Sequence, residues 1–156
     1  MEDKIKDFWN RFLDKTLRDK STTYNDVFYF ELTEKISNEL LDLVLIGKKR
    51  ATASSYSSYK IEDRPLPKKG DLSIVTNFYG IPRCVIETTE ITIMPFKDIT
   101  FDICSREGED DNLESWQRGH TKFFTEEGKL LGYEFSRNML VVFEDFEVIY
   151  VEWQNV

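Results

Sequence analysis

Apolar residues recur at helical spacing in three segments of the chain, with charged residues between them. Residues 4–19 carry the first stripe, a second helix is expected to follow Thr33 and to end at Gly47, and a third stripe runs from Leu113 to Phe124. Such stripes predict amphipathic helices that pack one face on the protein. The polar face of the first helix carries charges of both signs, which favours packing on the domain over contact with a membrane.

Three other segments have the pattern of β-strands. Residues 71–78 alternate and residues 83–94 are rich in Val, Ile and Thr, and the turn signal Tyr79-Gly80 between them predicts a hairpin. Residues 139–153 are nearly continuous in apolar and aromatic residues, which predicts a central strand. Residues 97–106 are expected to form a short helix. This order of elements predicts one α+β domain with a barrel-like or strongly curved sheet.

Composition narrows the class of protein. The chain has 156 residues, 40% of them hydrophobic, which is enough for one domain with its own core. Its net charge of −8 argues against a protein that coats DNA, because phosphate neutralisation requires excess Lys and Arg. A single His and two distant cysteines predict no metal, no cofactor and a reducing compartment. No secretory signal or membrane span is recognisable, so we expect a cytoplasmic protein.

Charged residues are unevenly distributed in the middle of the chain. Seven basic side chains stand between Gly47 and Gly70 against two acids, whereas residues 99–115 hold six acids and one Arg. If the fold brings these segments together, they would form a cleft with a cationic and an anionic wall, suited to a polar ligand rather than a long polyanion. If it does not, both segments are solvated loops, which is the usual fate of charge runs.

Lys49 and Thr52 are the first candidates for chemistry. Three positions apart, they would share a face in a helical turn and point to opposite sides in a strand. A lysine desolvated in a pocket can lose its proton and then take one from a threonine hydroxyl, which turns the hydroxyl into a nucleophile. The alternative is an ordinary surface lysine beside a strand threonine.

Other side chains have a structural and a functional interpretation. His120 lies on a helical stripe with Trp116 and Phe123, so a hydrogen-bonded, partly buried histidine is the default and contact with a base is the alternative. Tyr56 could stack on a nucleobase, although core packing explains most aromatic residues. Cys104, near the acidic segment, is expected to be more exposed than a cysteine in the middle of a strand.

Residues 47–52, Gly-Lys-Lys-Arg-Ala-Thr, match the G-x-K-x-x-T signature of the ASCH domain, the activating-signal-cointegrator homology family. The resemblance continues in the proline loop that enters a strand at residues 64–72, in the strand at residues 84–90 and in the helix at residues 116–124. It covers about residues 25–152, and the chain is identified on these motifs as a member of the family.

The resemblance implies a PUA-like fold, which is a small mixed β-barrel with flanking helices and a cleft. It assigns residues 25–156 to this domain and leaves residues 1–24 as a helical extension packed on it. Relatives of this fold often bind RNA or modified bases. The resemblance therefore implies a modified nucleoside or a short single-stranded RNA as the ligand.

A bacterial branch of the family consists of N4-acetylcytidine amidohydrolases, whose catalytic set is a lysine, a threonine and a glutamate. Carried over by position, Lys49 is the base and later the acid, Thr52 the nucleophile, and Glu109 the acid that orients or balances the lysine. The branch's E-x-E pattern resembles Glu107-Gly108-Glu109, so Glu107 is the alternative acid. The hydroxyl-rich residues 54–58 depart from the branch, which leaves the substrate open.

Three hypotheses follow. The first is an amidohydrolase of acylated nucleosides. The second is a non-catalytic RNA or nucleotide binder, and the third is a protein-interaction domain that forms a homodimer through the first helix. The expected ligand contacts around the catalytic set are six side chains: Lys48, Arg50, Glu107, Tyr56, Lys69 and His120.

Overall fold

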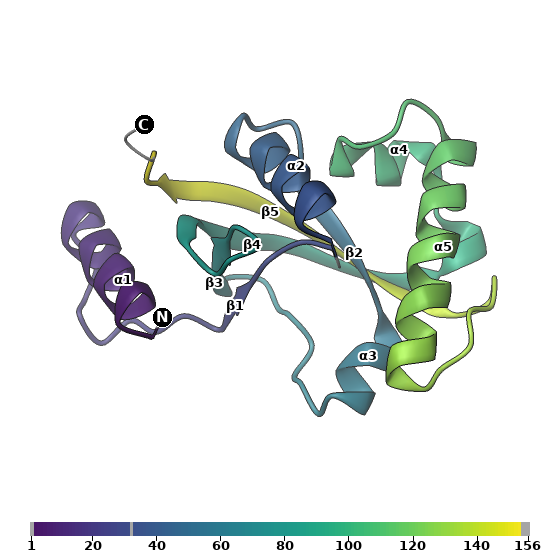
Figure 1. Cartoon of the computed structure of the whole chain (residues 1–156), viewed down its shortest axis with the longest axis horizontal. Helices are drawn as coiled ribbons and strands as arrows, with labels where there is room; N and C mark the ends of the chain where they lie inside the picture. The colour runs from purple at the N-terminus through teal and green to yellow at the C-terminus, as the bar shows by residue number, and fades with distance from the viewer. Residues whose placement is uncertain (1, 32, 154–156) are drawn as a thin grey trace. The chain divides into compact units, whose positions relative to one another are not determined.

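The computed structural model describes residues 2–31 and 33–153 (Figure 1). Five strands form one mixed sheet in the order β1-β3-β4-β5-β2. The chain divides into two compact units: unit 1 extends up to Gly47 and includes Gly70–Thr88 and the chain from Phe146 onward, and unit 2 comprises Lys48–Lys69 and Thr89–Asp145. Strands β4 (Pro82–Pro95) and β5 (Leu140–Val151) contribute residues to both units.

Unit 1 holds the hairpin and two of the predicted helices. Strand β1 (Asp26–Phe28) pairs in parallel with β3 (Leu72–Thr76), and β3 pairs antiparallel with β4. The turn of this hairpin includes Gly80, whose φ of 83° is the left-handed conformation that glycine adopts without strain. The predicted hairpin is therefore confirmed.

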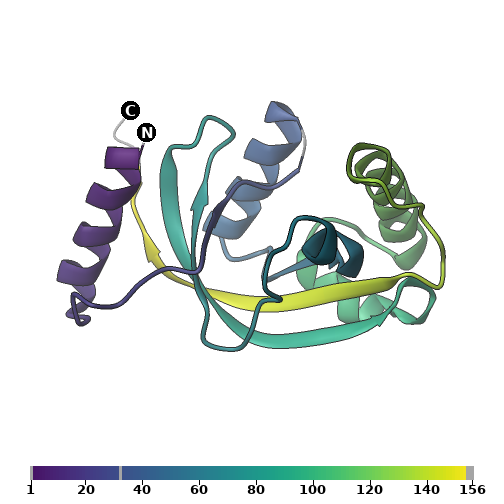
Figure 2. The same ribbon diagram turned by 90° about the horizontal axis from the view of Figure 1, so that it is seen from below.

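Helices α1 (Glu2–Thr16) and α2 (Glu34–Leu45) cover the two faces of these strands (Figure 2). Successive strand residues point to opposite faces, so Leu72 and Ile74 of β3 pack with α1, whereas Val75 packs with α2. Both faces of β3 are covered, and all five of its residues are buried.

Unit 2 holds the candidate site. Strand β2 (Ala51–Ser55) pairs antiparallel with the first part of β5 and leads directly into α3 (Tyr56–Ile61). Two 3-10 turns (Phe96–Asp98 and Ser105–Glu107) flank the short helix α4 (Phe101–Cys104). The long helix α5 (Leu113–Leu131) follows.

The core of unit 2 is aromatic. Phe96 stacks on Trp116 with ring centroids 5.4 Å apart, and Phe124 packs edge-on against Phe96. Cys104 belongs to this core, and at 2% exposed it is scarcely more exposed than the mid-strand Cys84 at 0%, contrary to expectation. The short helix α4 turns Cys104 inward instead of leaving it on the acidic loop.

The structure confirms the predicted α+β class. The helices expected at residues 4–19, after Thr33 and from Leu113 are present, and β5 lies between β4 and β2 in the sheet order, as expected for a central strand. The elements β1, β2 and α3 were not predicted. Within residues 2–31 and 33–153, none of the helices has the length and apolar character needed to cross a membrane.

Candidate functional site

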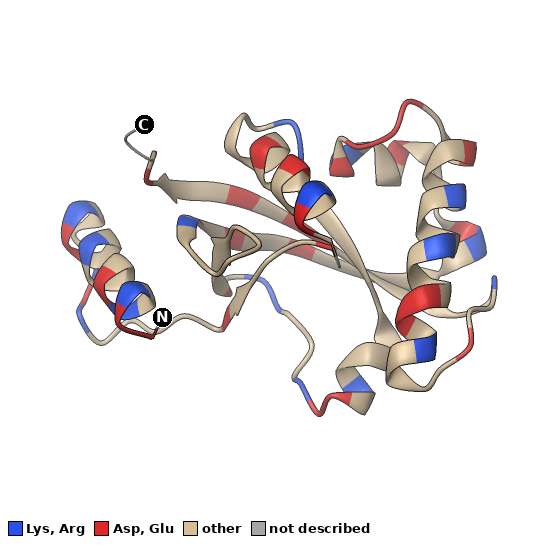
Figure 3. Ribbon diagram, viewed as in Figure 1, with Lys and Arg blue, Asp and Glu red and all other residues tan. Residues whose placement is uncertain are grey.

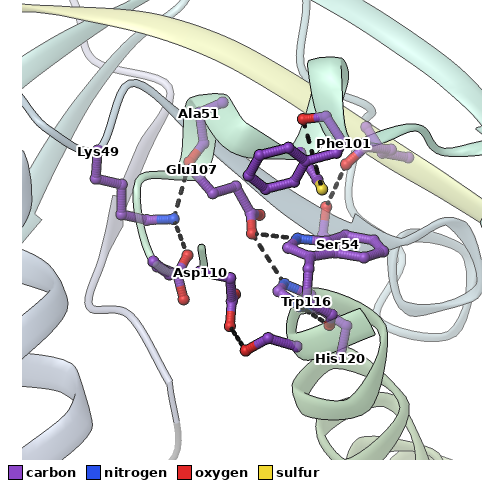
Figure 4. A network of polar contacts seen from close by, with 12 residues as sticks. Lys49, Ala51, Ser54, Phe101, Glu107, Asp110, Trp116 and His120 are labelled. Atoms are coloured by element: carbon purple, nitrogen blue, oxygen red, sulfur yellow. Dashed lines mark hydrogen bonds and ion pairs between the residues drawn. The ribbon is translucent and has the colours of Figure 1, made fainter. Parts of the chain in front are cut away.

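Lys49 lies in the segment of the chain that joins α2 to β2. It is buried, with only 2% of its side chain exposed. Its Nζ donates to the Ala51 carbonyl oxygen at 2.8 Å and forms an ion pair with Glu109 Oε2 at 2.6 Å (Figure 4). A buried lysine is rare unless it is paired, because water no longer solvates the ammonium group. Glu109 therefore supplies the counter-charge that the buried position requires.

The basic and acidic segments of unit 2 contact each other, which is one of the two arrangements that the sequence left open. Besides the Lys49–Glu109 pair, the backbone N–H of Arg50 donates to the Arg106 carbonyl oxygen at 2.9 Å. Arg106 also pairs with both carboxylate oxygens of Asp145, at 2.8 and 2.9 Å. The two segments are thus held by backbone and side-chain bonds together.

Gly108 lets the two acids of the E-x-E pattern approach Lys48 and Lys49. Its φ of 71° lies in the left-handed region, and a Cβ at this position would collide with the Lys48 carbonyl oxygen. Any other residue would therefore push residues 107–109 away from the lysine. The glycine between the acids is a requirement of the site.

Glu107 lies deeper than Glu109, and only 1% of it is exposed. Its Oε2 accepts hydrogen bonds from Trp116 Nε1 at 2.8 Å and from His120 Nε2 at 3.0 Å (Figure 4). The imidazole of His120 stacks on the Trp116 indole, with centroids 4.2 Å apart. Trp116 and His120 are one helical turn apart on α5, which places both on the same acid.

The partners of His120 require both of its ring nitrogens to donate. Nε2 faces the Glu107 carboxylate, and Nδ1 lies 3.0 Å from the Trp116 carbonyl oxygen, so both neighbours are acceptors. An imidazole can donate from both nitrogens only when it is protonated. The local hydrogen bonding therefore describes an imidazolium ion.

The two acids have opposite pKa shifts. Burial alone would raise the pKa of Glu107, but the charges of Lys49 and His120 and the bonds from His120 and Trp116 outweigh burial and lower its pKa to about 2. Burial raises the pKa of Glu109, and the charge of Glu107 adds to this effect, which exceeds the opposing attraction of Lys49. Burial opposes protonation of His120, but Glu107 outweighs it and raises the pKa of the imidazole.

Thr52 lies in β2 opposite Glu144 and is partly buried. Ala53 packs on the core of unit 2, so the alternation of the strand places Thr52 on the other face. Lys49 Nζ bonds to the carbonyl of Ala51, the residue that precedes Thr52. The amine of Lys49 therefore contacts the main chain directly before Thr52.

The remaining sequence candidates lie at the surface or at its edge. Lys48, Arg50 and Lys69 are exposed, and Lys48 and Arg50 flank the buried Lys49. Tyr56 lines a cavity of about 240 Å³ beside α3. Within residues 2–31 and 33–153, no group of three His, Cys, Asp or Glu side chains is arranged to hold a metal ion.

Two participants were missed from the sequence, namely the indole of Trp116 and the carbonyl of Ala51. Trp116 was interpreted only as part of an apolar stripe, although its spacing from His120 puts its N–H on the same side of α5. That spacing was the available signal. The carbonyl of Ala51 has no sequence signal, because every residue carries one.

The α+β arrangement with a mixed five-stranded sheet is that of a PUA-like domain. The model of the ASCH domain matches residues 26–150. The chain therefore belongs to the ASCH domain family.

Solved structures agree with this assignment. The chain is similar to an ASCH domain from Lactobacillus crispatus JV V101, with 35% identity, a TM-score of 0.86 and 96% of each chain covered. It is also similar to a protein of Enterococcus faecalis V583, with 34% identity, a TM-score of 0.88, and 97% of this chain and 91% of that chain covered. Among curated proteins, none matches this chain significantly.

Proposed function

We propose that the protein is an amidohydrolase that removes the acyl group from the exocyclic amine of N4-acetylcytidine-type nucleosides. The observation that carries the proposal is the buried Lys49–Glu109 pair, 2.6 Å long, whose lysine contacts the main chain directly before Thr52 in the signature segment. A buried ion pair costs free energy to desolvate and is a weak source of stability, which favours a chemical role for it.

In the proposed reaction, the hydroxyl oxygen of Thr52 attacks the acyl carbonyl carbon and its proton passes to Lys49 Nζ. The tetrahedral intermediate collapses, the C–N bond breaks, and Lys49 returns the proton to the leaving amine. Water then attacks the threonine ester and gives a proton to Lys49, which protonates Thr52 as the carboxylic acid leaves. General acid–base assistance of this kind contributes about 10²- to 10⁴-fold in rate.

Lys49 must be neutral when it accepts the proton of Thr52. In this proposal Lys49 becomes neutral by transferring its own proton to Glu109. The pKa of Glu109 is raised, chiefly by burial. A carboxylate with a raised pKa accepts a proton from Lys49 Nζ along the 2.6 Å contact at a lower cost than an ordinary glutamate would. Glu109 thus acts as the temporary holder of the lysine proton.

Glu107 and His120 are positioning residues in this proposal. Glu107 is hydrogen-bonded by Trp116 and His120 and is almost completely buried, so its carboxylate contacts other side chains of the protein and is not available to a substrate. Its negative charge contributes to the raised pKa of Glu109. The exposed Lys48 and Arg50 beside the pair are the contacts for a polar ligand.

The test is release of cytidine from N4-acetylcytidine by the wild-type protein, followed by chromatography. We expect Lys49→Met and Thr52→Val to lower kcat/KM by about 10³-fold or more, because each removes a reacting group. Thr52→Ser should keep measurable activity, since it retains the hydroxyl. Glu109→Gln should lower kcat more than it changes KM.

Lys129→Met is the matched control, because Lys129 is an exposed lysine in the last turn of α5 and has no role in the proposed site. It should keep kcat within a few-fold of the wild type. Absence of release by the folded wild-type protein would overturn the amidohydrolase proposal. Binding of cytidine or of a short single-stranded RNA without turnover would then favour the non-catalytic hypothesis.

A further inference from the structure

A cavity of about 240 Å³ lies in unit 2 and is lined by residues that follow β2 in the chain. Helix α3 and the chain that follows it form its walls. Its lining combines two aromatic rings, two cationic side chains, one acid and one leucine: Tyr56, Tyr59, Lys60, Asp63, Arg64 and Leu66. None of these residues takes part in the chemical step proposed above.

The cavity is connected to Thr52 through one face of β2. Thr52 and Ser54 are two residues apart on the strand, so their side chains lie on the same face, about 7 Å apart. The Ser54 hydroxyl then meets the Tyr59 hydroxyl at 2.7 Å. Tyr59 belongs to the cavity wall, so the side chain of Ser54 links the face of β2 that carries Thr52 to this wall.

Arg64 is oriented before any ligand arrives. Its guanidinium lies over the Tyr59 ring, 4.5 Å from the centroid, which fixes the plane of the group. Its Nε–H is buried and has no hydrogen-bond acceptor among the described residues. Its terminal nitrogen contacts the partly exposed Glu62 at 3.3 Å, which is a long, solvent-screened pair.

The buried Nε–H of Arg64 is closed to a ligand, whereas the side chain as a whole is 38% exposed, which leaves its terminal nitrogens for one. A guanidinium presents its donors as a planar fork that matches phosphate oxygens, and the neighbouring Lys60 adds a second positive charge. Asp63 is the one acid in the lining and limits the site to a single anionic group rather than a polyanion. The tyrosine rings suit the apolar face of a sugar or base.

We propose that this cavity binds the phosphate of a nucleotide, so that the preferred substrate is an N4-acylated cytidine 5′-monophosphate rather than the free nucleoside. The inference rests on the proposed function, because it names the substrate class of the same site. The acyl group reaches Thr52, and the phosphate end extends along β2 toward Arg64 and Lys60.

The experiment compares N4-acetylcytidine with N4-acetylcytidine 5′-monophosphate as substrates. We expect the wild-type protein to show a kcat/KM at least about tenfold higher for the monophosphate, which is the size of one charge-assisted contact. Arg64→Met should remove this preference, because it should lower kcat/KM for the monophosphate much more than kcat/KM for the nucleoside. Lys60→Met, at an exposed position, should reduce the preference, whereas the exposed Arg137→Met should not.

Equal rates with the two substrates would overturn the inference and leave the proposed function intact. If neither substrate is deacylated, the proposed function fails and the phosphate site is tested by itself. The protein is then titrated with cytidine monophosphate and with cytidine, and binding is monitored by amide chemical shifts. Tighter binding of the monophosphate, with shifts in residues 56–66 that Arg64→Met abolishes, would support the phosphate site. Equal binding of both, or shifts elsewhere only, would overturn the inference as well.

Discussion

Glu107 and Glu109 stand two residues apart, and their partners drive their pKa values in opposite directions. Glu107 receives two hydrogen bonds and faces two cations, so its charged form is favoured despite burial. Among the residues that the structure describes, Glu109 is bonded by Lys49, and the charge of Glu107 also acts on it. A pair of carboxyl groups with separated pKa values provides one fixed charge and one group that can exchange a proton.

His120 is the one histidine of the chain, so its titration can be followed directly by imidazole NMR signals. Because Glu107 raises the pKa of His120, we expect a midpoint above the ordinary value of about 6.5. The folded state then binds the proton more tightly than the unfolded state. This contribution to stability is full below pH 6.5 and is lost as the pH rises through the folded midpoint.

Glu107→Gln removes the charge that holds this proton and should lower the midpoint of His120. The exposed Asp111→Asn removes one charge nearby without a bond to the histidine, and it should leave the midpoint nearly unchanged. A wild-type midpoint below 6.5, or equal effects of the two substitutions, would contradict the ion pair.

Helix α5 carries the site because its first half presents Trp116 and His120 and its two ends are well terminated. The Asn112 side chain accepts from the Ser115 backbone N–H at 2.8 Å, which caps the N-terminus. At the other end Gly132, with a φ of 98°, donates to the Gly128 carbonyl oxygen. Tyr133 donates to the same carbonyl and reverses the chain.

At two glycines inside α5, substitution by alanine is expected to change the free energy of unfolding in opposite directions. Gly119 is exposed, and a Cβ there would meet no atom within 4 Å, so Gly119→Ala should raise the free energy of unfolding by about 1 kcal/mol. A Cβ at Gly128 would collide with the Tyr133 carbonyl oxygen, so Gly128→Ala should lower stability by about 1–3 kcal/mol.

Denaturant unfolding of both variants beside the wild type measures these two changes. The helix-propensity gain is the same for the two substitutions, so the difference between the variants reports the contact with Tyr133. A stabilised Gly128→Ala protein would show that the turn after α5 moves at little cost.

The molecule as a whole is acidic, with a net charge of −8, although its site contains basic residues. Several of these cations already have acidic partners, such as Lys49 with Glu109 and Arg106 with Asp145. Figure 3 shows both signs of charge on the helices and loops. Binding to a long polyanion depends on many unneutralised cations, and this charge distribution does not supply them.

We therefore expect a 16-base-pair RNA duplex to bind with a dissociation constant above about 10⁻⁴ M at 150 mM salt, measured by fluorescence anisotropy. A basic double-stranded-RNA-binding domain in the same assay is the positive control. Micromolar affinity with a steep salt dependence would contradict this expectation and would favour an RNA-binding role.

Much of the fold could be predicted because its larger elements have a local signature. Helices α1, α2 and α5 are long enough for an apolar stripe to repeat, and β3, β4 and β5 are apolar strands. Strand β2, with the sequence Ala-Thr-Ala-Ser-Ser, has no such signature. It is a strand because β5 supplies its hydrogen bonds, which is a non-local cause that a window of sequence does not contain.

At the site, the sequence determined the residue types: the lysine and threonine of the signature, and two acids separated by a glycine. Only the tertiary structure decided which acid meets the lysine and which is held by Trp116 and His120. Glu107 and Glu109 have the same chemistry and nearly the same position in the chain. The choice between them depends on burial and on partners from α5 and the segment before β2, and folding alone brings those partners together.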